Sequence, residues 1–524
     1  MTTNVRYAVS KPARTLNEQY MMPSENDSGS TKMQTQHTDH CETVPKAKAN
    51  ETNCINDGPI LDDHWHAVSR SLVRKLDLTL MPMIWVLYLF NYLDRNSISS
   101  ANLNSIKEDL SLSGEDFNTV VSILNVGQHI LILNSYMAMQ ILSNMILTRV
   151  RPSLYIPLWA CAWSIVSAST GAVQNFGQLI TVRCLLGIAE APFFPGVYYL
   201  LSCWYTRKEL GLRMAFMYTG LIVAIAFSGL IAAGVFSRLD HALGLAGWRW
   251  LYIIVGSVNF LLAVASMFLL PDFPEAATGS QRWLLSEEEQ KVALERIAAD
   301  SVTQESNRSL LYGLRLAVSD RRTWAFVMLL LCNHAAFGFS YFFPSIVKGF
   351  GFGSTIVTLL CTSPPYLVGA VMSVVVSWSS DSRGERGYHI AVPAYIAAAG
   401  FIVSVATLNG PTRYAASFLY VSGCYAANGL IYGWAANVLN QTPEKKAVAT
   451  SMLNVLAQLG NIISPYFFRE QDEPRYLLAM FLLIGFSAAS GCISLGLKWD
   501  LRRANRLITD AAVATGQQPR FFAT

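Results

Sequence analysis

Twelve apolar segments dominate this sequence of 524 residues and constrain its fold more than any other feature. A helix that crosses a bilayer needs about 20 consecutive, mainly apolar residues. The segments lie near 79–100, 118–147, 153–173, 177–201, 211–236, 250–270, 323–345, 355–378, 389–408, 414–439, 447–468 and 476–497. The sequence therefore predicts an all-α integral membrane protein with twelve transmembrane helices that cross a lipid bilayer.

The composition agrees with this class. Hydrophobic residues make up 52% of the chain and charged residues only 14%, whereas soluble domains have about 25% charged residues. The net charge of +4 is spread along the sequence, so no patch predicts nucleic-acid binding. The nine cysteines are odd in number and widely spaced, and they predict neither a disulfide framework nor a metal site.

The segments fall into two sets of six separated by a polar connection. We expect a disordered cytosolic tail over 1–77, a first six-helix half over 78–270, a cytosolic central loop over 271–322, a second half over 323–498 and a cytosolic tail over 499–524. The 1–77 tail is polar and begins with no cleavable signal pattern.

The orientation follows from the Lys and Arg residues in the connections, because cytosolic connections are enriched in them. If the first tail is cytosolic, the inner connections contain Arg149, Arg151, Arg213, Lys445 and Arg502 among others, and the outer connections are much poorer. We therefore expect a multi-pass protein with both termini in the cytosol.

Asp94 and Arg95 lie inside the first apolar segment. A charged side chain in the middle of a membrane helix costs about 2.5–3.5 kcal/mol on insertion scales, so such residues usually face a bundle interior or a watery cavity. One interpretation is that Arg95 binds substrate and Asp94 takes part in proton coupling. The other is that the two side chains neutralise each other and only hold neighbouring helices together.

Arg183 and Glu190 lie in the fourth segment. Their separation of seven residues is close to two helical turns, which puts both on one side of a helix about 10 Å apart. Glu190 is a candidate proton carrier, and Arg183 and Arg95 are candidates to bind an anion, because the arginine fork fits a carboxylate. A structural ion pair between the first and fourth helices is the alternative.

The second half supplies polar groups that are mostly uncharged. We expect Asn333, Tyr341, Tyr432 and Asn437 to hydrogen-bond the body of a ligand and His334 to titrate. Further polar residues in these segments are Tyr366, Asn428, Asn454, Gln458 and Asn461. Each could equally be a packing contact, because polar side chains hydrogen-bond between membrane helices.

A charged loop lies between the eighth and ninth segments. Its residues Asp381, Arg383 and Arg386 are candidates to pair across helix ends and hold an inner gate shut, and Gly384 permits a tight turn. Arg149 and Arg151, between the second and third segments, are further gating candidates, although no acidic residue accompanies them there. A solvated loop whose basic residues only fix topology is the competing interpretation.

These motifs carry a family resemblance. The two sets of six segments, the Asp381–Arg386 loop and the run from Arg183 to Gly196 resemble the major facilitator superfamily. The runs Asn91–Asn96, Trp204–Leu210, Gly229–Gly234 and Gly247–Leu251 resemble, more narrowly, the fungal allantoate permease and nicotinic acid permease group of anion:cation symporters.

The resemblance implies a plasma-membrane symporter with the major facilitator fold, and we expect a monomer. It would move a small organic anion, such as nicotinate, allantoate or a related vitamin or nitrogen source, inward with protons by rocking one half against the other. In related anion transporters, arginines of helices one and four and a glutamate of helix four bind substrate and couple protons, and Arg95, Arg183 and Glu190 match those positions. Some relatives also use an arginine in helix seven, and none lies within 323–345, so a strictly dianionic substrate is not implied.

The second segment departs from the family pattern. Residues Gln128 to Ser135 stand between Gly127 and Tyr136, where relatives usually read Val-Gly-Tyr without a break. A helix of about 30 residues would span about 45 Å, against a hydrocarbon core of about 30 Å. We hypothesise either a misplaced splice boundary or a true insertion that damages the helix.

Two other functions stay open at this point. The first is an exporter of organic anions or secondary metabolites with the same fold, and the second is a nutrient-sensing membrane receptor. An enzyme is not expected, because no nucleophile–base pair, metal cluster or nucleotide loop is present in the sequence. No cofactor is expected either.

Overall fold

The computed structural model describes residues 58–113, 115–133, 151–275, 280–300 and 310–515, and these residues form helices without strands. The first group comprises α1 (Gly58–Ala101), α2 (Ile106–Asp109), α3 (Asp116–Leu133), α5 (Pro152–Ser169), α6 (Phe176–Glu190), α7 (Phe193–Trp204), α8 (Arg207–Leu239) and α9 (Gly247–Leu269). The connecting helices are α10 (Gln281–Leu284), α11 (Glu287–Asp300) and α12 (Leu310–Ser319). The second group comprises α13 (Arg321–Ala336), α14 (Phe339–Lys348), α15 (Thr355–Arg383), α16 (Gly387–Ala406), α17 (Gly410–Val438), α18 (Pro443–Ile463) and α19 (Leu477–Thr515).

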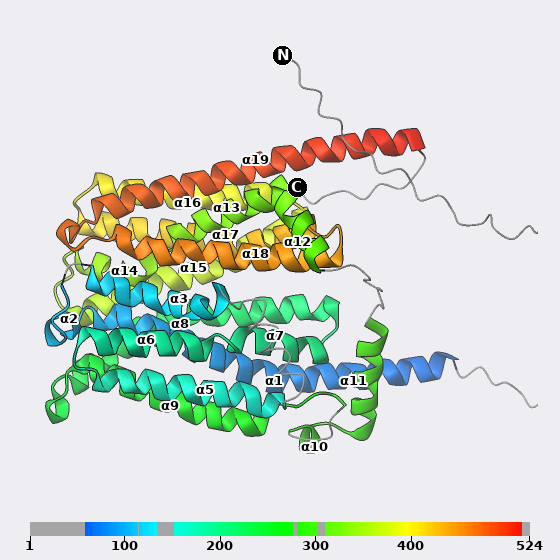
Figure 1. Cartoon of the computed structure of the whole chain (residues 1–524), viewed down its shortest axis with the longest axis horizontal. Helices are drawn as coiled ribbons and strands as arrows, with labels where there is room; N and C mark the ends of the chain where they lie inside the picture. The colour runs from blue at the N-terminus through cyan, green and yellow to red at the C-terminus, as the bar shows by residue number, and fades with distance from the viewer. Residues whose placement is uncertain (1–57, 114, 134–150, 276–279, 301–309, 516–524) are drawn as a thin grey trace, which may run out of the picture. The chain divides into compact units, whose positions relative to one another are not determined.

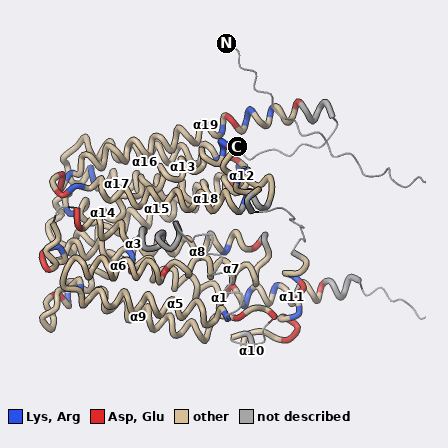
Figure 2. Tube along the Cα trace, viewed as in Figure 1, with Lys and Arg blue, Asp and Glu red and all other residues tan. Residues whose placement is uncertain are grey.

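The long helices run beside one another, as Figure 1 shows, and the connecting helices gather at one end of them. We call this end the connector end, and the opposite end, which carries α2, the distal end. Charged residues concentrate near the two ends, and the middle of the helices is mainly uncharged (Figure 2). This distribution is what a bilayer favours, because a charged side chain in the hydrocarbon layer is energetically costly.

Eight helices in the described residues are long and apolar enough to cross a membrane by length and composition. Three of the other four predicted segments correspond to α5, α17 and α18, which are helical. The remaining segment, 118–147, begins in α3, and its residues 134–147 lie outside the described part. Of the stretch Gln128 to Ser135, the structure describes only the part up to Leu133, which continues α3. The hypothesis about this stretch therefore extends beyond the described residues.

Two predicted segments are broken helices. The segment 177–201 is divided into α6 and α7 at Ala191 and Pro192, and the segment 323–345 into α13 and α14 at Phe337 and Gly338. The predicted first boundary, at residue 77, lies inside α1.

The two groups of helices, α1–α9 and α13–α19, are the two halves of the protein. They meet closely at the distal end. Asn118 donates its side-chain amide to the Phe468 carbonyl at 3.1 Å, and the Ser122 hydroxyl donates to the Ile462 carbonyl at 2.9 Å. The Asn102 amide donates to the Ser345 hydroxyl at 3.0 Å. One buried apolar cluster here contains residues of both halves, so the distal end is closed.

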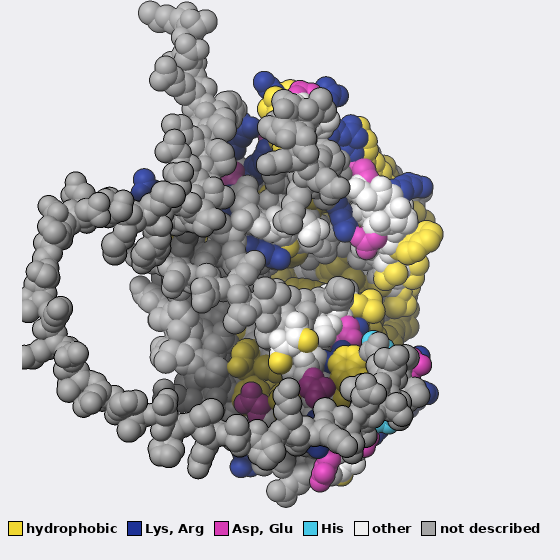
Figure 3. Space-filling view, turned by 90° about the vertical axis from the view of Figure 1, so that its right-hand side faces the viewer, with side chains coloured by type: hydrophobic (Ala, Val, Ile, Leu, Met, Phe, Trp, Pro, Cys, Tyr) yellow, Lys and Arg dark blue, Asp and Glu magenta, His cyan; other side chains and the backbone are white. Residues whose placement is uncertain are grey.

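The connector end is organised differently. Its buried apolar clusters each belong to one half: one is built from α1 and α5 to α9, with contributions from α3, α10 and α11, and the other from α12, α13 and α16 to α19. The hydrogen bonds between the halves made by Asn102, Asn118 and Ser122 lie at the distal end instead. Figure 3 looks onto this end and shows charged side chains over it, with hydrophobic side chains continuing along one flank.

The connecting helices α11 and α12 are fixed to different halves. Arg296 of α11 pairs with Glu209 of α8 at 2.6 Å, and Glu289 of α11 pairs with Lys75 of α1 at 2.8 Å. Helix α12 instead packs against α13 and α18. Each half therefore holds its own part of the connection, which is compatible with movement of one half against the other.

The Glu289 carboxylate of α11 accepts hydrogen bonds from three groups. Burial alone would raise its pKa, but hydrogen bonds from Lys75, from the Ser286 backbone and from the Ser71 hydroxyl outweigh burial and hold the pKa below its ordinary 4.5. A carboxyl whose native pKa is depressed stabilises the fold at a pH above its unfolded value. That contribution is lost as the pH falls through the native value.

We therefore predict that Glu289→Gln loosens α11 at neutral pH. The expected cost is about 1–2 kcal/mol, because the Glu289 carboxylate loses the charge that strengthens its bonds from Lys75, Ser286 and Ser71, while Lys75 stays partly exposed to water. Hydrogen exchange over 287–300 measures this, and acidification of the wild type from pH 6 to below 4 should reproduce the effect. The control is Glu288→Gln, at an exposed position of the same helix. Equal protection in both variants would contradict the prediction.

Candidate functional site

A cavity of about 400 Å³ lies between the two halves. Its size is within the range of small-molecule sites in proteins, which is about 300–1,000 Å³. Its walls come from the first half through α1, α3, α5, α8 and the α6–α7 break, and from the second half through α13, α14, α17 and α18. The distal contacts close it on one side.

Arg95 and Glu190 form an ion pair in the wall of this cavity. Arg95 Nε donates to Glu190 Oε2 at 2.8 Å, and this bond joins α1 to the end of α6. The Glu190 side chain is fully buried, whereas 17% of the Arg95 side chain is exposed. The Arg95 guanidinium also lies 4.8 Å from the centre of the Tyr92 ring. The arginine is therefore a partly accessible cation whose charge is balanced by one carboxylate.

Helix breaks bring several of these residues to the cavity. Glu190 is the last residue of α6, and Pro192, which lacks a backbone N–H, precedes α7. In the second half, α13 ends before Gly338, where an added Cβ would lie 2.4 Å from Ser464 Cβ. Glycine is required at this close approach.

Aromatic side chains line much of the cavity. They are Tyr88, Tyr92, Trp159, Phe193, Phe194, Tyr218, Phe337, Tyr341, Tyr425 and Tyr432. Side-chain amides add hydrogen-bonding groups from Asn91, Asn96, Asn125, Asn428, Asn454, Gln458 and Asn461. A cavity with flat apolar faces, amides and one accessible cation fits a small planar ligand that carries a negative charge.

The structure brings five of the predicted site residues together at this cavity: Arg95, Glu190, His334, Tyr341 and Tyr432. His334 is buried, and its ring lies 6.5 Å from the Tyr432 ring. The Tyr432 hydroxyl donates to Asn454 Oδ1 at 3.3 Å.

Asp94 and Arg183 lie behind the cavity wall. Asp94 is fully buried and accepts hydrogen bonds from the Ser167 hydroxyl and the Asn259 amide, each at 2.8 Å, which ties α1 to α5 and α9. Arg183 is also buried, and its Nη2 donates to the Tyr252 hydroxyl. Arg183 shares a side of α6 with Glu190 but lies two turns nearer the distal end, where the halves are closed.

Two further predicted residues do not line the cavity. Asn333 is buried within the second half, and Asn437 is exposed. Sequence reasoning did not single out Tyr88, Asn91 and Tyr92 as site residues. Their spacing of seven, four and three residues before Arg95 could have identified them, because helical residues at those spacings share a face.

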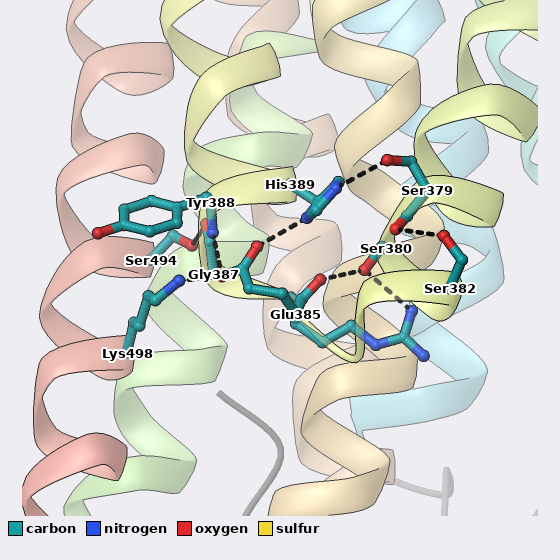
Figure 4. A network of polar contacts seen from close by, with 10 residues as sticks. Ser379, Ser380, Ser382, Glu385, Gly387, Tyr388, His389, Ser494 and Lys498 are labelled. Atoms are coloured by element: carbon teal, nitrogen blue, oxygen red, sulfur yellow. Dashed lines mark hydrogen bonds and ion pairs between the residues drawn. The ribbon is translucent and has the colours of Figure 1, made fainter.

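The charged loop between α15 and α16 forms its own network. Arg386 pairs with Asp381 inside the loop, and Arg383 is exposed. Figure 4 shows Glu385 between His389 and Lys498 of α19, and His389 Nδ1 lies 2.7 Å from a Glu385 oxygen. Burial opposes the charge of Glu385, but bonds from Lys498, the Tyr388 backbone and His389 lower its pKa.

All of these bonds stay within the second half, so in this conformation the loop does not bridge to the first half. Of the other gating candidates, Arg151 is exposed at the start of α5, and Arg149 lies outside the described residues. The gating roles stay predictions.

Comparison with known proteins identifies the fold. Residues 84–465 match the family described as Major Facilitator Superfamily. The chain belongs to the major facilitator superfamily. Solved structures of this superfamily agree: a bacterial homolog to the human lysosomal transporter Spinster, inward-facing and unoccupied, has a TM-score of 0.59 at 15% identity and covers 80% of this chain and 94% of its own. A D-xylose-proton symporter also has a TM-score of 0.59, at 13% identity, with 79% and 96% covered.

Similar sequences in the major facilitator superfamily come from fungi. An uncharacterized transporter of Schizosaccharomyces pombe is 30% identical over 84% of this chain and 85% of its own length. The MFS-type transporter cnsO of Penicillium expansum is 31% identical over 83% and 84%, and the major facilitator-type transporter hxnP of Emericella nidulans is 29% identical over 83% and 84%.

The predicted fold class is thus confirmed, as is the prediction that the chain is no enzyme. As a major facilitator superfamily member it is a multi-pass secondary transporter with a lipid bilayer around it and a small-molecule substrate.

The buried hydrogen bonds of Asp94 predict that this residue contributes to the stability of the fold. Asp94→Ala would leave the Ser167 hydroxyl and the Asn259 amide without acceptors, which costs about 1–3 kcal/mol for each buried donor. We expect a lower thermal-unfolding midpoint of the purified protein in detergent. Tyr432→Phe, which removes one cavity hydroxyl, serves as control and should change stability by less than about 1 kcal/mol. An unchanged midpoint for Asp94→Ala would contradict the assignment.

Proposed function

We propose that this transporter carries a small organic carboxylate across the membrane together with a proton, by alternating access. The observation that carries the proposal is the Arg95–Glu190 ion pair in the wall of the cavity between the halves. Charged side chains are costly to place inside a membrane. Those that are present usually mark substrate and proton pathways.

Arg95 is the proposed substrate-binding cation. Its fork can bind a carboxylate through two parallel hydrogen bonds, and it is partly accessible from the cavity. Tyr92 beneath the guanidinium supports its orientation. Tyr341, Tyr432 and the amides of α17 and α18 would contact the rest of the ligand.

Glu190 is the proposed proton carrier. It already pairs with Arg95, so an arriving carboxylate would place two negative charges on one arginine. A proton on Glu190 removes that repulsion and frees Arg95 for the substrate. Substrate and proton would then enter the cavity together, which is the condition for symport. His334 and Asp94 are secondary proton-coupling candidates.

The cavity lining favours a planar ring acid. Aromatic faces stack well on flat rings, and the amides offer both donors and acceptors to ring nitrogens. Nicotinate has these features, whereas allantoate is aliphatic and rich in urea groups. Within the fungal anion:cation symporter group that the sequence resembles, we therefore place this chain with the carriers of aromatic acids.

The orientation proposed from the basic connections puts the connector end in the cytosol of a plasma-membrane protein. The closed distal end then faces outside, and the conformation is inward-facing. Uptake requires two changes. The hydrogen bonds from Asn118 and Ser122 to the Phe468 and Ile462 carbonyls must break, and the connector end must close. Asp381, Arg383, Arg386 and Arg151 lie at the end where such closure would occur, and Arg149, outside the described residues, stays a gating candidate from the sequence. We propose that a monomer suffices.

The test is uptake of labelled nicotinate, allantoate and pantothenate into yeast lacking its own permeases, at acid and neutral outside pH. We expect accumulation of a ring acid that is faster at acid pH and collapses with a protonophore, and weaker competition by allantoate. Efflux without proton-driven accumulation would instead favour an exporter. Ligand binding without any flux would favour a sensor.

Two variants test the residue roles. Arg95→Ala should weaken substrate affinity by about 10- to 150-fold, the equivalent of one charge-assisted hydrogen bond of about 1.5–3 kcal/mol. Glu190→Gln should abolish accumulation against a gradient but allow downhill flux. The control is Glu275→Gln, at an exposed position after α9. If both variants reach the membrane and still accumulate substrate, the proposed mechanism is wrong.

A further inference from the structure

Arg413 is a buried cation at the distal end of the second half. It lies in the first turn of α17, and only 3% of its surface is exposed. Among the described residues it belongs to no ion pair, and its Nε–H has no acceptor. A buried, unpaired charge is expensive, so the position calls for a negative partner.

The guanidinium of Arg413 lies at the start of its helix. Its Cζ is 4.8 Å from the centre of the Phe350 ring. Phe350 itself packs on Gly410, the first residue of α17, where an added Cβ would lie 2.1 Å from the Phe350 carbonyl oxygen. Side chains of a helix tilt toward its N-terminus, which brings the guanidinium back to this point.

The start of α17 adds positive potential of its own. The first N–H groups of a helix have no internal acceptor, and the helix dipole places a partial positive charge there. Asn409, the residue before α17, gives no side-chain cap. The helix start therefore repels Arg413 and attracts an anion.

A second arginine lies close by. Arg475 acts on Arg413 as a neighbouring positive charge, and its Nη2 donates to the Val405 carbonyl at 3.2 Å, just before the α16–α17 connection. Glu470, five residues before Arg475, lies 3.7 Å from Lys107 of the first half. Arg475 thus adds a second positive charge in the neighbourhood of Arg413.

We propose that Arg413, Arg475 and the start of α17 bind a small monovalent anion, either a halide or a carboxylate. This site is separate from the central cavity, which none of these residues lines. The inference does not rest on the proposed transport function.

The test uses the purified full-length protein in detergent with sodium isethionate, whose bulky anion is a poor fit. Replacing isethionate by chloride or by formate at constant ionic strength should raise the thermal-unfolding midpoint with a saturable dependence, because a ligand that binds the native state stabilises it. The two salts show whether the site takes a halide or a carboxylate, and a response to either supports the site.

The variants decide where the anion binds. Arg413→Gln should unfold no lower than the wild type in isethionate and lose the response to both anions. Arg475→Gln, which keeps the buried arginine, should raise the half-saturating anion concentration about tenfold. Arg238→Gln, at an exposed distal position, should keep the wild-type response. A wild type insensitive to both anions, or an unchanged response in Arg413→Gln, would overturn the proposal.

Discussion

The need to bond every backbone polar group inside a hydrocarbon layer is the constraint on which the rest of this structure depends. Long helices satisfy it, and they leave only side chains to provide function. Charges inside such helices must then find partners within the protein. Asp94 finds Ser167 and Asn259, and Arg95 finds Glu190. Asp94 is thus held by neutral hydrogen-bond donors and Arg95 by a carboxylate.

The broken helices place irregular backbone beside the cavity. The Ala191–Pro192 and Phe337–Gly338 breaks both lie at the cavity, one in each half. Backbone that leaves the helical path at this depth is tolerated where it lines a cavity or is buried in protein. The breaks also place Glu190 and Tyr341 close to helix ends, where a side chain can face the space between the halves.

The contrast between the two ends of the bundle connects structure to transport. At the distal end one apolar cluster and several hydrogen bonds join the halves, whereas at the connector end each half has a cluster of its own. Two packings of the same halves, closed at opposite ends, are what alternating access requires. Because α11 and α12 are held by different halves, the connection between them can follow either packing.

The sequence by itself determined the class of protein: the apolar segments predicted a membrane bundle of two halves, and the charges inside them pointed to Arg95 and Glu190. It could not decide which of the neighbouring polar residues reach the cavity. Adjacent residues of a helix differ by about 100° in direction, so Asp94 turns to α5 and α9 while Arg95 faces the cavity. His334 and Asn333 differ in the same way. Arg183 shares a side with Glu190 but lies at the depth where the halves close, and Asn437 points to an exposed surface. Only the packing of the helices sets their rotation and depth, because contacts between distant segments fix both.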